Sequence, residues 1–238
     1  MSARSSTSSS AERPGAAAAV IVAGGSGRRV GGAVRKQYLE IAGEPILLRA
    51  VLPFVRHPEI GTVVVVLPPD DAVDPPPWLA ELGVRIVAGG AERGDSVWNG
   101  LLATPEDAET VLVHDGARPF VPREVVDRVL EGARSSPVLA ALPVTDTLKE
   151  VLDDGTVAGT PDRSRFWQAQ TPQGFPRKTI LAAYRRAREE GFRATDDAAV
   201  CERYGIPVRV VEGAVENLKV THPADLAAAE ALARRLLP

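Results

Sequence analysis

Short runs of apolar, β-branched residues alternate along this chain with longer segments that carry apolar residues at helical spacing. Near-continuous apolar runs of this length are typical of strands in a parallel sheet that is covered on both faces. We expect strands at Ala18–Val22, Thr62–Leu67, Val84–Val87, Thr110–His114, Val138–Pro143 and Val208–Val211. We expect helices at Pro45–Arg56, Ser96–Ala103, Pro122–Ser135, Pro176–Glu190, Thr195–Tyr204 and Pro223–Leu237. The alternation predicts an α/β domain with a mostly parallel sheet and helices on both faces.

One section breaks this alternation. Residues Thr145–Ala158 read TDTLKEVLDDGTVA, in which two short alternating segments flank Asp154 and Gly155. Asp-Gly between such segments is a hairpin signal. A hairpin that leaves an α/β core needs another surface to lie against, often that of a second subunit. We therefore expect a protruding β-hairpin over about 144–166.

Composition narrows the class of protein. The 238 residues are enough for one large α/β domain, to which we assign residues 16–238. Residues 1–15 are polar and lack the apolar segment of a secretory signal, so we interpret them as a disordered tail. A net charge of −3 argues against a nucleic-acid binder, and no apolar run is long enough to predict a membrane span. A single cysteine, Cys201, fits a cytoplasmic protein without disulfides.

The first expected strand runs directly into a glycine-rich, basic loop. Residues Ala17–Gln37 read AAAVIVAGGSGRRVGGAVRKQ, and the cations of the loop are Arg28, Arg29, Arg35 and Lys36. A buried strand that ends in small residues presents backbone N–H groups to phosphate, and neighbouring cations neutralise a polyphosphate. We therefore hypothesise an enzyme that acts on a nucleoside triphosphate, with a basic surface loop as the alternative.

Two well-known phosphate loops fit this segment poorly. A Walker A loop needs Ser or Thr directly after its lysine, whereas Gln37 follows Lys36 here. A dinucleotide fingerprint needs a third glycine, where this chain has Val30. It also needs an acidic residue at the end of the next strand, and we expect Glu40 and Glu44 to lie in a loop. The segment therefore indicates a triphosphate loop of another type.

Polar clusters follow two further strands at the same expected edge of the sheet. In GGAERGDSV, Asp95 or Ser96 fits a helix cap, and we expect Ser96 to face a ligand. In VHDGARPF, Asp115 is placed to hold Mg²⁺ or a ribose hydroxyl, or else to form a buried pair with Arg118. We interpret His114 as a packed residue rather than a base.

Further polar clusters lie beside apolar runs or near expected helix starts. QAQTPQGF (Gln168–Phe175) is one of them. Thr195 with Asp196 fits the start of one helix, and Thr221 fits the cap of the C-terminal helix. Lys219 is one of only four lysines and lies just before that helix, so it faces either a phosphate or the solvent.

In order and in spacing, these segments resemble the 2-C-methyl-D-erythritol 4-phosphate cytidylyltransferase family from about Ala17 to the C-terminus. The matching motifs are AGGSGRR…KQYL, GGAERGDSV, VHDGARPF, TDTLK, QTPQGF, TDDA and NLKVT. The resemblance implies a Rossmann-like fold of the nucleotidyltransferase type A kind, and a homodimer joined through the hairpin arm. It implies that the phosphate of 2-C-methyl-D-erythritol 4-phosphate attacks the α-phosphate of CTP and that pyrophosphate leaves. Mg²⁺ or another divalent cation is expected on the triphosphate.

The resemblance also implies roles for individual residues. The expected catalytic residues, which stabilise the charge of the transition state, are Arg29, Lys36 and Lys219. The residues expected around CTP are Ala23, Gly24, Gly25, Ser26, Gly27, Gly90, Ala91, Ser96 and Asp115, of which Asp115 is also the candidate metal ligand. The residues expected around the acceptor are Thr147, Arg163, Thr171, Thr195 and Lys219, with Arg163 supplied by the partner subunit.

Three positions depart from the family's usual pattern. Arg35 stands where proline usually precedes the lysine, Gly24 replaces a frequent alanine, and Ala91 stands where an acidic residue can occur. Two other functions remain open at this point. One is a cytidylyltransferase for another polyol phosphate, such as ribitol 5-phosphate. The other is a nucleotide-binding module without catalysis, against which the intact Arg29, Lys36 and Asp115 argue.

Overall fold

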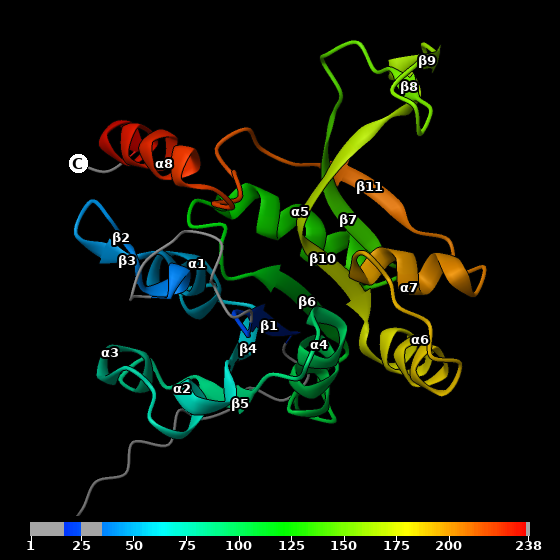
Figure 1. Ribbon diagram of the computed structural model, residues 1–238. Helices are drawn as coiled ribbons and strands as arrows, with labels where there is room; N and C mark the ends of the chain where they lie inside the picture. The colour runs from blue at the N-terminus through cyan, green and yellow to red at the C-terminus, as the bar shows by residue number, and fades with distance from the viewer. Residues whose placement is uncertain (1–16, 25–34, 237–238) are drawn as a thin grey trace, which may run out of the picture.

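The computed structural model describes residues 17–24 and 35–236, and its central feature is a seven-stranded sheet (Figure 1). The strand order is β11-β7-β10-β6-β1-β4-β5. In chain order the strands are β1 (Ala17–Val22), β4 (Ile60–Leu67), β5 (Arg85–Ala88), β6 (Thr110–Asp115), β7 (Val138–Pro143), β10 (Trp167–Pro176) and β11 (Arg209–Glu212). Neighbouring strands are parallel except where β10 is one of the pair. The predicted mostly parallel α/β sheet is confirmed.

Helices cover both faces of the sheet because successive side chains of a strand point to opposite faces. On β1, Ala19 and Ile21 belong to one apolar cluster, whereas Ala18 and Val20 belong to another. The helices of the first cluster are α1 (Ile46–Val55), α3 (Pro77–Ala80) and α5 (Arg123–Ala133). Those of the second are α4 (Arg93–Leu102), α6 (Arg177–Glu189) and α7 (Asp197–Arg203). Cys201 is buried in the second cluster.

The C-terminal helix α8 (Pro223–Leu236) packs on a smaller apolar cluster of its own. Its Ala229 and Ala233 share this cluster with Ile41, Ile46 and Phe120. The remaining short elements were not predicted: the 3₁₀ helices η2 (Lys36–Tyr38) and η3 (Arg163–Arg165), the helix α2 (Pro69–Val73), and the strands β2 (Glu40–Ile41) and β3 (Glu44–Pro45). Glu40 and Glu44 therefore lie in a small hairpin rather than in a loop.

The strand β10 is missing from the sequence prediction, although it lies inside the sheet between β7 and β6. Its sequence, WQAQTPQGFP, reads as a polar cluster because Gln170, Thr171 and Gln173 are all buried polar residues. Partners from distant segments satisfy these side chains: Gln170 Nε2 donates to the carbonyl of Ala214 at 2.9 Å, and Gln173 Oε1 accepts from the N–H of Ala198 at 2.8 Å. A buried strand whose polar groups are paired through tertiary contacts carries no apolar periodicity.

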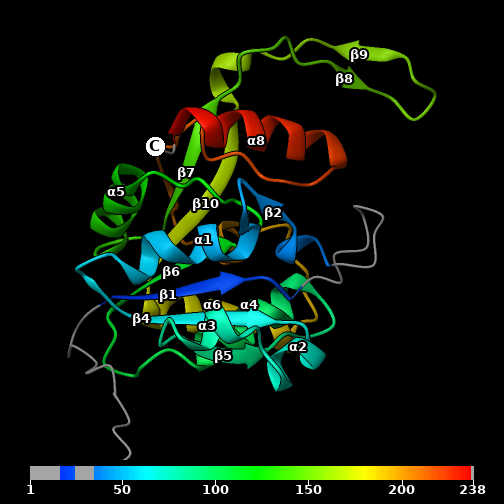
Figure 2. The same ribbon diagram turned by 90° about the vertical axis from the view of Figure 1, so that its left-hand side faces the viewer.

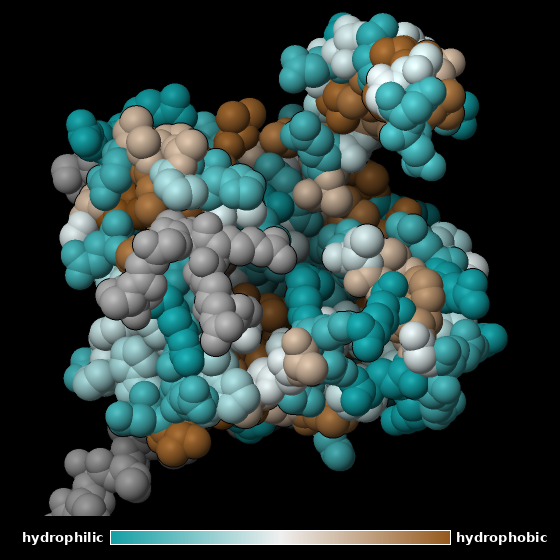
Figure 3. All heavy atoms as spheres, in the orientation of Figure 1, coloured by the Kyte–Doolittle hydropathy of each residue, from teal (hydrophilic) through white to brown (hydrophobic). Residues whose placement is uncertain are grey.

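The predicted hairpin arm is present as β8 (Glu150–Val151) and β9 (Val157–Gly159), which pair antiparallel. The turn between them contains Gly155, whose φ of +84° favours glycine. Figures 1 and 2 show this arm standing away from the central sheet. It exposes apolar side chains at Val151, Leu152 and Val157, and Figure 3 shows brown, hydrophobic atoms on the arm.

Among the described residues, no helix combines the length and the apolar character that crossing a membrane requires.

Candidate active site

The candidate site lies where the carboxyl ends of β1 and β6 meet. After β1 the chain forms β4 and β5 on one side of this strand and then returns to form β6 on its other side, so the strand order reverses between β1 and β6. Open α/β sheets bind ligands at such a reversal. The N–H of Gly116 donates to the carbonyl of Val22 at 2.9 Å, which holds the two strand ends together. The N–H of Val220 donates to the carbonyl of Ala117 at 2.9 Å, so the segment 217–221 lies against the loop that follows β6.

Two lysines reach this place from opposite ends of the chain. Lys36 of η2 extends its Nζ to the carbonyl of Val220 at 2.7 Å. Lys219, the residue before Val220, places its Nζ 2.6 Å from Oδ2 of Asp115. Tertiary structure therefore brings together three residues that the sequence analysis took from three separate motifs.

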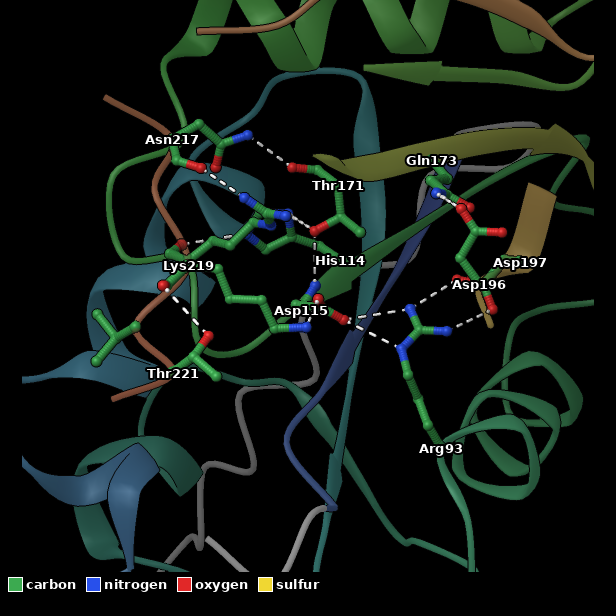
Figure 4. Close-up of polar contacts among 12 residues, drawn as sticks. Arg93, His114, Asp115, Thr171, Gln173, Asp196, Asp197, Asn217, Lys219 and Thr221 are labelled. Atoms are coloured by element: carbon green, nitrogen blue, oxygen red, sulfur yellow. Dashed lines mark hydrogen bonds and ion pairs between the residues drawn. The ribbon is translucent and has the colours of Figure 1, made fainter. Parts of the chain in front are cut away.

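Asp115 is the centre of a charged cluster that also contains Arg93, Asp197 and Lys219 (Figure 4). The guanidinium of Arg93 reaches its Oδ1 with two nitrogens, each at 3.2 Å, while Lys219 occupies Oδ2. Burial alone would raise the pKa of Asp115, but the charges of Arg93 and Lys219 outweigh it and hold this pKa well below its ordinary value. Asp115 is therefore an ionised acceptor at neutral pH.

Arg93 connects Asp115 to the start of α7, as Figure 4 shows. Its two terminal nitrogens lie 2.8 and 3.0 Å from the two carboxylate oxygens of Asp197, and Oδ1 of Asp197 also accepts from the hydroxyl of Tyr184 at 2.6 Å. Burial would lower the pKa of Arg93, but the two carboxylates raise it well above its ordinary value. The charged guanidinium thereby fixes the end of β6 relative to α7.

His114 lies beneath this cluster as a neutral, packed residue. Nε2 of His114 lies 3.2 Å from the carbonyl of Arg118, which can only accept, so Nε2 carries the proton of the neutral ring. Nδ1 is then an acceptor, and the hydroxyl of Thr171, 3.1 Å away, donates to it while accepting from the N–H of Asp115 at 3.0 Å. Burial lowers the pKa of His114 to about 4. The prediction that His114 is packed is confirmed: the residue is fully buried, and its ring centroid lies 4.9 Å from that of Phe54, with the two planes tilted by 46°.

Asn217 fastens the C-terminal segment to this centre. Its side-chain Nδ2 donates to the main-chain carbonyl of Thr171 at 2.8 Å, and its main-chain carbonyl accepts from the guanidinium of Arg118 at 2.7 Å. The suggested ion pair between Asp115 and Arg118 was wrong, because Arg118 turns to Asn217 and the partners of Asp115 are Arg93 and Lys219. Burial lowers the pKa of Arg118.

Ser96 closes the other side of the site. Of the two suggested caps, Asp95 takes part and Ser96 does not: α4 begins at Arg93, and the side chain of Asp95 accepts from the N–H of Glu92 in a capping box. Ser96 instead accepts from the N–H of Gly90 at 3.1 Å and donates to the carbonyl of Glu92 at 3.1 Å. A Cβ on Gly24 would stand 2.8 Å from Oγ of Ser96, so glycine permits the close approach of these loops.

Comparison with known proteins agrees with this geometry. The family model described as 2-C-methyl-D-erythritol 4-phosphate cytidylyltransferase matches residues 17–235. A protein of that description from Syntrophus aciditrophicus is 45% identical over 217 residues, which are 88% of this chain and 92% of the relative. One from Symbiobacterium thermophilum is 44% identical over 208 residues, or 87% and 88% of the two chains.

Solved structures show the same likeness. The 4-diphosphocytidyl-2C-methyl-D-erythritol synthase of Anaerococcus prevotii superposes with a TM-score of 0.80 at 31% identity, covering 92% of this chain and 98% of that one. The 2-C-methyl-D-erythritol 4-phosphate cytidylyltransferase of Thermus thermophilus gives 0.76 at 38% identity, covering 90% and 98%. The chain belongs to the 2-C-methyl-D-erythritol 4-phosphate cytidylyltransferase family. It is therefore a nucleotidyltransferase.

The predicted CTP residues of this family member divide into two groups. The first group lies near the carboxyl ends of β1, β5 and β6: Ala23 and Gly24 follow β1, Gly90 follows β5, Ser96 lies in the first turns of α4, and Asp115 ends β6. Ala91 is exposed next to Gly90. The second group, Gly25, Ser26 and Gly27, lies outside the described residues, as does the predicted catalytic residue Arg29.

The predicted acceptor residues are less concentrated. Lys219 is part of the charged cluster, and Thr171 contacts it through the main-chain N–H of Asp115. Thr195 is exposed beside Asp196, which caps α7 by accepting from the N–H of Ala199 at 2.9 Å. Thr147 and Arg163 are exposed on the arm, where Arg163 donates to the carbonyl of Thr145 at 2.6 Å.

Thr221 does not act as the cap suggested for α8. Asp225, in the first turn of α8, accepts instead from the N–H groups of Thr221 and His222, each at 2.7 Å. The N-terminal end of α8 is thus held by a side chain from inside the helix.

Three residues that hold the charged cluster together were not predicted from the sequence. Arg93, Asp197 and Asn217 all stand inside quoted motifs, as the R of GGAERGDSV, the last D of TDDA and the N of NLKVT. A charged or amide side chain inside each motif was the available signal, but nothing local shows that they contact one centre.

Proposed function

We propose that this chain transfers the cytidylyl group of CTP to the phosphate of 2-C-methyl-D-erythritol 4-phosphate, giving 4-diphosphocytidyl-2-C-methyl-D-erythritol and pyrophosphate. The observation that carries the proposal is the convergence of Lys36, Lys219 and Asp115 at the point between β1 and β6. An enzyme that transfers a nucleotidyl group to a phosphate needs fixed cations around two anionic substrates, and this edge of the sheet supplies them.

In the proposed step, an oxygen of the acceptor phosphate attacks the α-phosphorus of CTP, and the bond from the α-phosphorus to the bridging oxygen breaks. Negative charge then spreads over the α-phosphate and the leaving pyrophosphate. Lys36 and Lys219 donate to these oxygens, and Arg29 is predicted to do the same. The attacking phosphate is already ionised, so positioning and charge neutralisation replace a general base. The neutral His114 fits this assignment, because its proton is committed to Arg118.

Lys219 and Asp115 have complementary roles in this proposal. The side chain of Lys219 is 41% exposed, whereas that of Asp115 is 11% exposed, so the lysine is accessible to a ligand while its carboxylate partner is fixed. A bound phosphate competes with Asp115 for the ammonium group. Asp115 then keeps Arg93 and becomes free on one oxygen to accept from a ribose hydroxyl or to face a metal ion.

A divalent cation such as Mg²⁺ fits this site only together with the nucleotide. Within residues 17–24 and 35–236, no group of three His, Cys, Asp or Glu side chains is arranged to hold a metal. Mg²⁺ is commonly held by one or two carboxylates plus substrate phosphates, and Asp115 supplies one carboxylate. When bound, the cation would neutralise charge on the triphosphate. This chain's own residues would orient the two phosphates.

The arm supports a homodimer as part of the proposal. Exposed Val151, Leu152 and Val157 form an apolar surface on a hairpin that stands away from its own sheet. Burying such side chains against a second subunit is favourable. Arg163 and Thr147 would then reach the acceptor site of the partner. A cytoplasmic location remains a prediction based on the single cysteine.

The proposal is tested by supplying CTP and Mg²⁺ with either 2-C-methyl-D-erythritol 4-phosphate or ribitol 5-phosphate. Pyrophosphate release is followed by a coupled assay, and the product by phosphorus NMR, in which a new diphosphate linkage appears. We expect turnover with the first acceptor and at most about one per cent of it with the second, since acceptor hydrogen bonds discriminate strongly. Turnover only with ribitol 5-phosphate would assign another acceptor. CTP binding without pyrophosphate release would indicate a non-catalytic module.

A further inference from the structure

Lys36 lies between two residues that are both attached to the short helix α2. Arg35 forms ion pairs with Asp70, at 3.3 Å, and with Asp71. The hydroxyl of Tyr38 donates to the second oxygen of Asp71 at 2.7 Å. One carboxylate therefore holds the residue before Lys36 and the residue at the end of the η2 turn.

Asp71 rather than Asp70 is the stronger anchor. The side chain of Asp71 is 19% exposed and that of Asp70 is 90% exposed, so solvent screens the Asp70 pair far more. Burial and the bond to Asp71 raise the pKa of Tyr38 well above its ordinary value, and the hydrogen bond to Asp71 raises that of Arg35. Both donors thus keep their protons over the whole working range of pH.

The anchor is itself fixed to the sheet. Helix α2 follows β4 directly, and its Ala72 packs against the apolar cluster that contains Leu67 and Leu79. From the other direction, the Nζ of Lys36 reaches Val220 at 2.7 Å. The η2 turn is thereby held at its base by α2, while its lysine extends into the candidate site.

The backbone of Arg35 has the conformation that a proline would adopt at this position. Its φ is −65° and its ψ is 141°, and −65° is the φ that a proline ring imposes. Arg35 stands where the resemblance leads us to expect proline. It has no ring to hold this conformation, whereas its side chain is tied to Asp71.

We propose that Asp71 is a positioning residue for Lys36, and that its contacts with Arg35 and Tyr38 replace the restraint of a proline before the lysine. The inference rests on the proposed cytidylyl transfer for its kinetic consequence. Asp71 touches no substrate and acts by keeping the ammonium group of Lys36 where charge develops. Without this restraint the ammonium group of Lys36 samples several positions, so kcat falls. KM for CTP stays nearly unchanged, because the contact is made mainly in the transition state.

The first experiment compares Asp71→Asn with Asp74→Asn, which makes the same chemical change at an exposed position at the end of the same helix. We expect Asp71→Asn to lower kcat about tenfold and to change KM for CTP less than about twofold. The control is expected to match the wild type. A lower Tm with an unchanged kcat would reduce Asp71 to a merely structural residue and overturn the proposal.

The second experiment asks whether a proline makes Asp71 dispensable. Arg35→Pro is expected to retain kcat within about threefold, and Asp71→Asn in that background to cost less than about threefold, because the ring now supplies the restraint. An equal tenfold loss in both backgrounds would contradict the proposal. A third variant, Arg35→Gln, tests whether Arg35 binds the triphosphate itself. If Arg35→Gln raises KM for CTP while Asp71→Asn leaves it unchanged, the proposal is also contradicted.

A readout without turnover separates this inference from the proposed function. Trypsin cleavage after Lys36, followed by mass spectrometry of the intact chain, should become about tenfold faster in Asp71→Asn and stay unchanged in Asp74→Asn. A wild-type protein that is inactive with CTP and both acceptors would refute the proposed function, and proteolysis would still decide whether Asp71 holds the turn. Equal cleavage rates in the two variants would refute the inference.

Discussion

The buried neutral His114 should make the stability of this protein depend on pH between about 4.5 and 7.5. Its pKa falls from the ordinary 6.5 to about 4 in the folded state, because burial desolvates the imidazole and disfavours its charged form. The unfolded chain therefore binds a proton in this window that the folded protein does not, and acidification favours unfolding. Each pKa unit is worth about 1.4 kcal/mol, so the free energy of unfolding should drop by roughly 2.5 kcal/mol from pH 7.5 to 4.5.

The window excludes the other strongly shifted group of the site. Asp115 has a lowered pKa, so its contribution to stability is complete above the ordinary value of 3.8 and is lost only below it. Urea unfolding followed by circular dichroism at several pH values measures the free energy directly. The comparison is with His114→Gln, whose amide keeps one acceptor for Thr171 and one donor for Arg118 but does not titrate.

We expect His114→Gln to be less stable at pH 7.5 and to lose most of the dependence on pH. His222→Gln, at an exposed histidine, is expected to keep the wild-type slope within about 0.5 kcal/mol. A wild-type protein whose stability is flat from pH 7.5 to 4.5, or a His114→Gln variant with the full wild-type slope, would refute the neutral, desolvated state of His114.

Three further predictions concern catalysis, assembly and the buried thiol. Lys36→Ala should lower kcat about 10²-fold or more with a small change in KM for CTP, and steady-state kinetics showing near-wild-type turnover would contradict its role in the transition state. Arg163→Ala should raise KM for the acceptor and leave CTP binding by calorimetry intact. At an acceptor concentration so low that neither variant alone turns over measurably, mixing Arg163→Ala and Lys36→Ala subunits should give about a quarter of the wild-type activity if one site per mixed dimer is complete; no recovery in verified mixed dimers would count against shared sites. Burial raises the pKa of Cys201 to about 12, so an aromatic disulfide reagent at pH 8 should label it only in urea, and rapid labelling of the native protein would disprove its burial.

Local pattern was enough for most of the fold. The strands β1, β4, β5, β6, β7 and β11 and the helices α1, α4, α5, α6, α7 and α8 were predicted within a few residues, because each carries its own apolar periodicity. The arm was predicted from its Asp-Gly turn. The strand β10 escaped because Gln170 and Gln173 find their hydrogen-bond partners at Ala214 and Ala198, which the local sequence cannot reveal.

The candidate site shows the same division. The glycine-rich loop, Lys36, Asp115 and Lys219 could be selected from the sequence, because their residue types and their places after strands indicate phosphate chemistry. Their pairing could not. The local sequence suggested that Asp115 pairs with Arg118, three residues away. In the fold its partners are Arg93 and Lys219.

The sequence by itself determined the elements, the edge of the sheet where the ligand should bind and the chemical character of that edge, because all three depend on residues that are neighbours along the chain. The tertiary structure alone decided which charges meet. Lys36 and Val220 are separated by 184 positions, and Asp115 and Lys219 by 104, yet each pair is in direct contact. Such contacts depend on how strands and loops pack, and so does the support that Asp71 gives to the turn of Lys36.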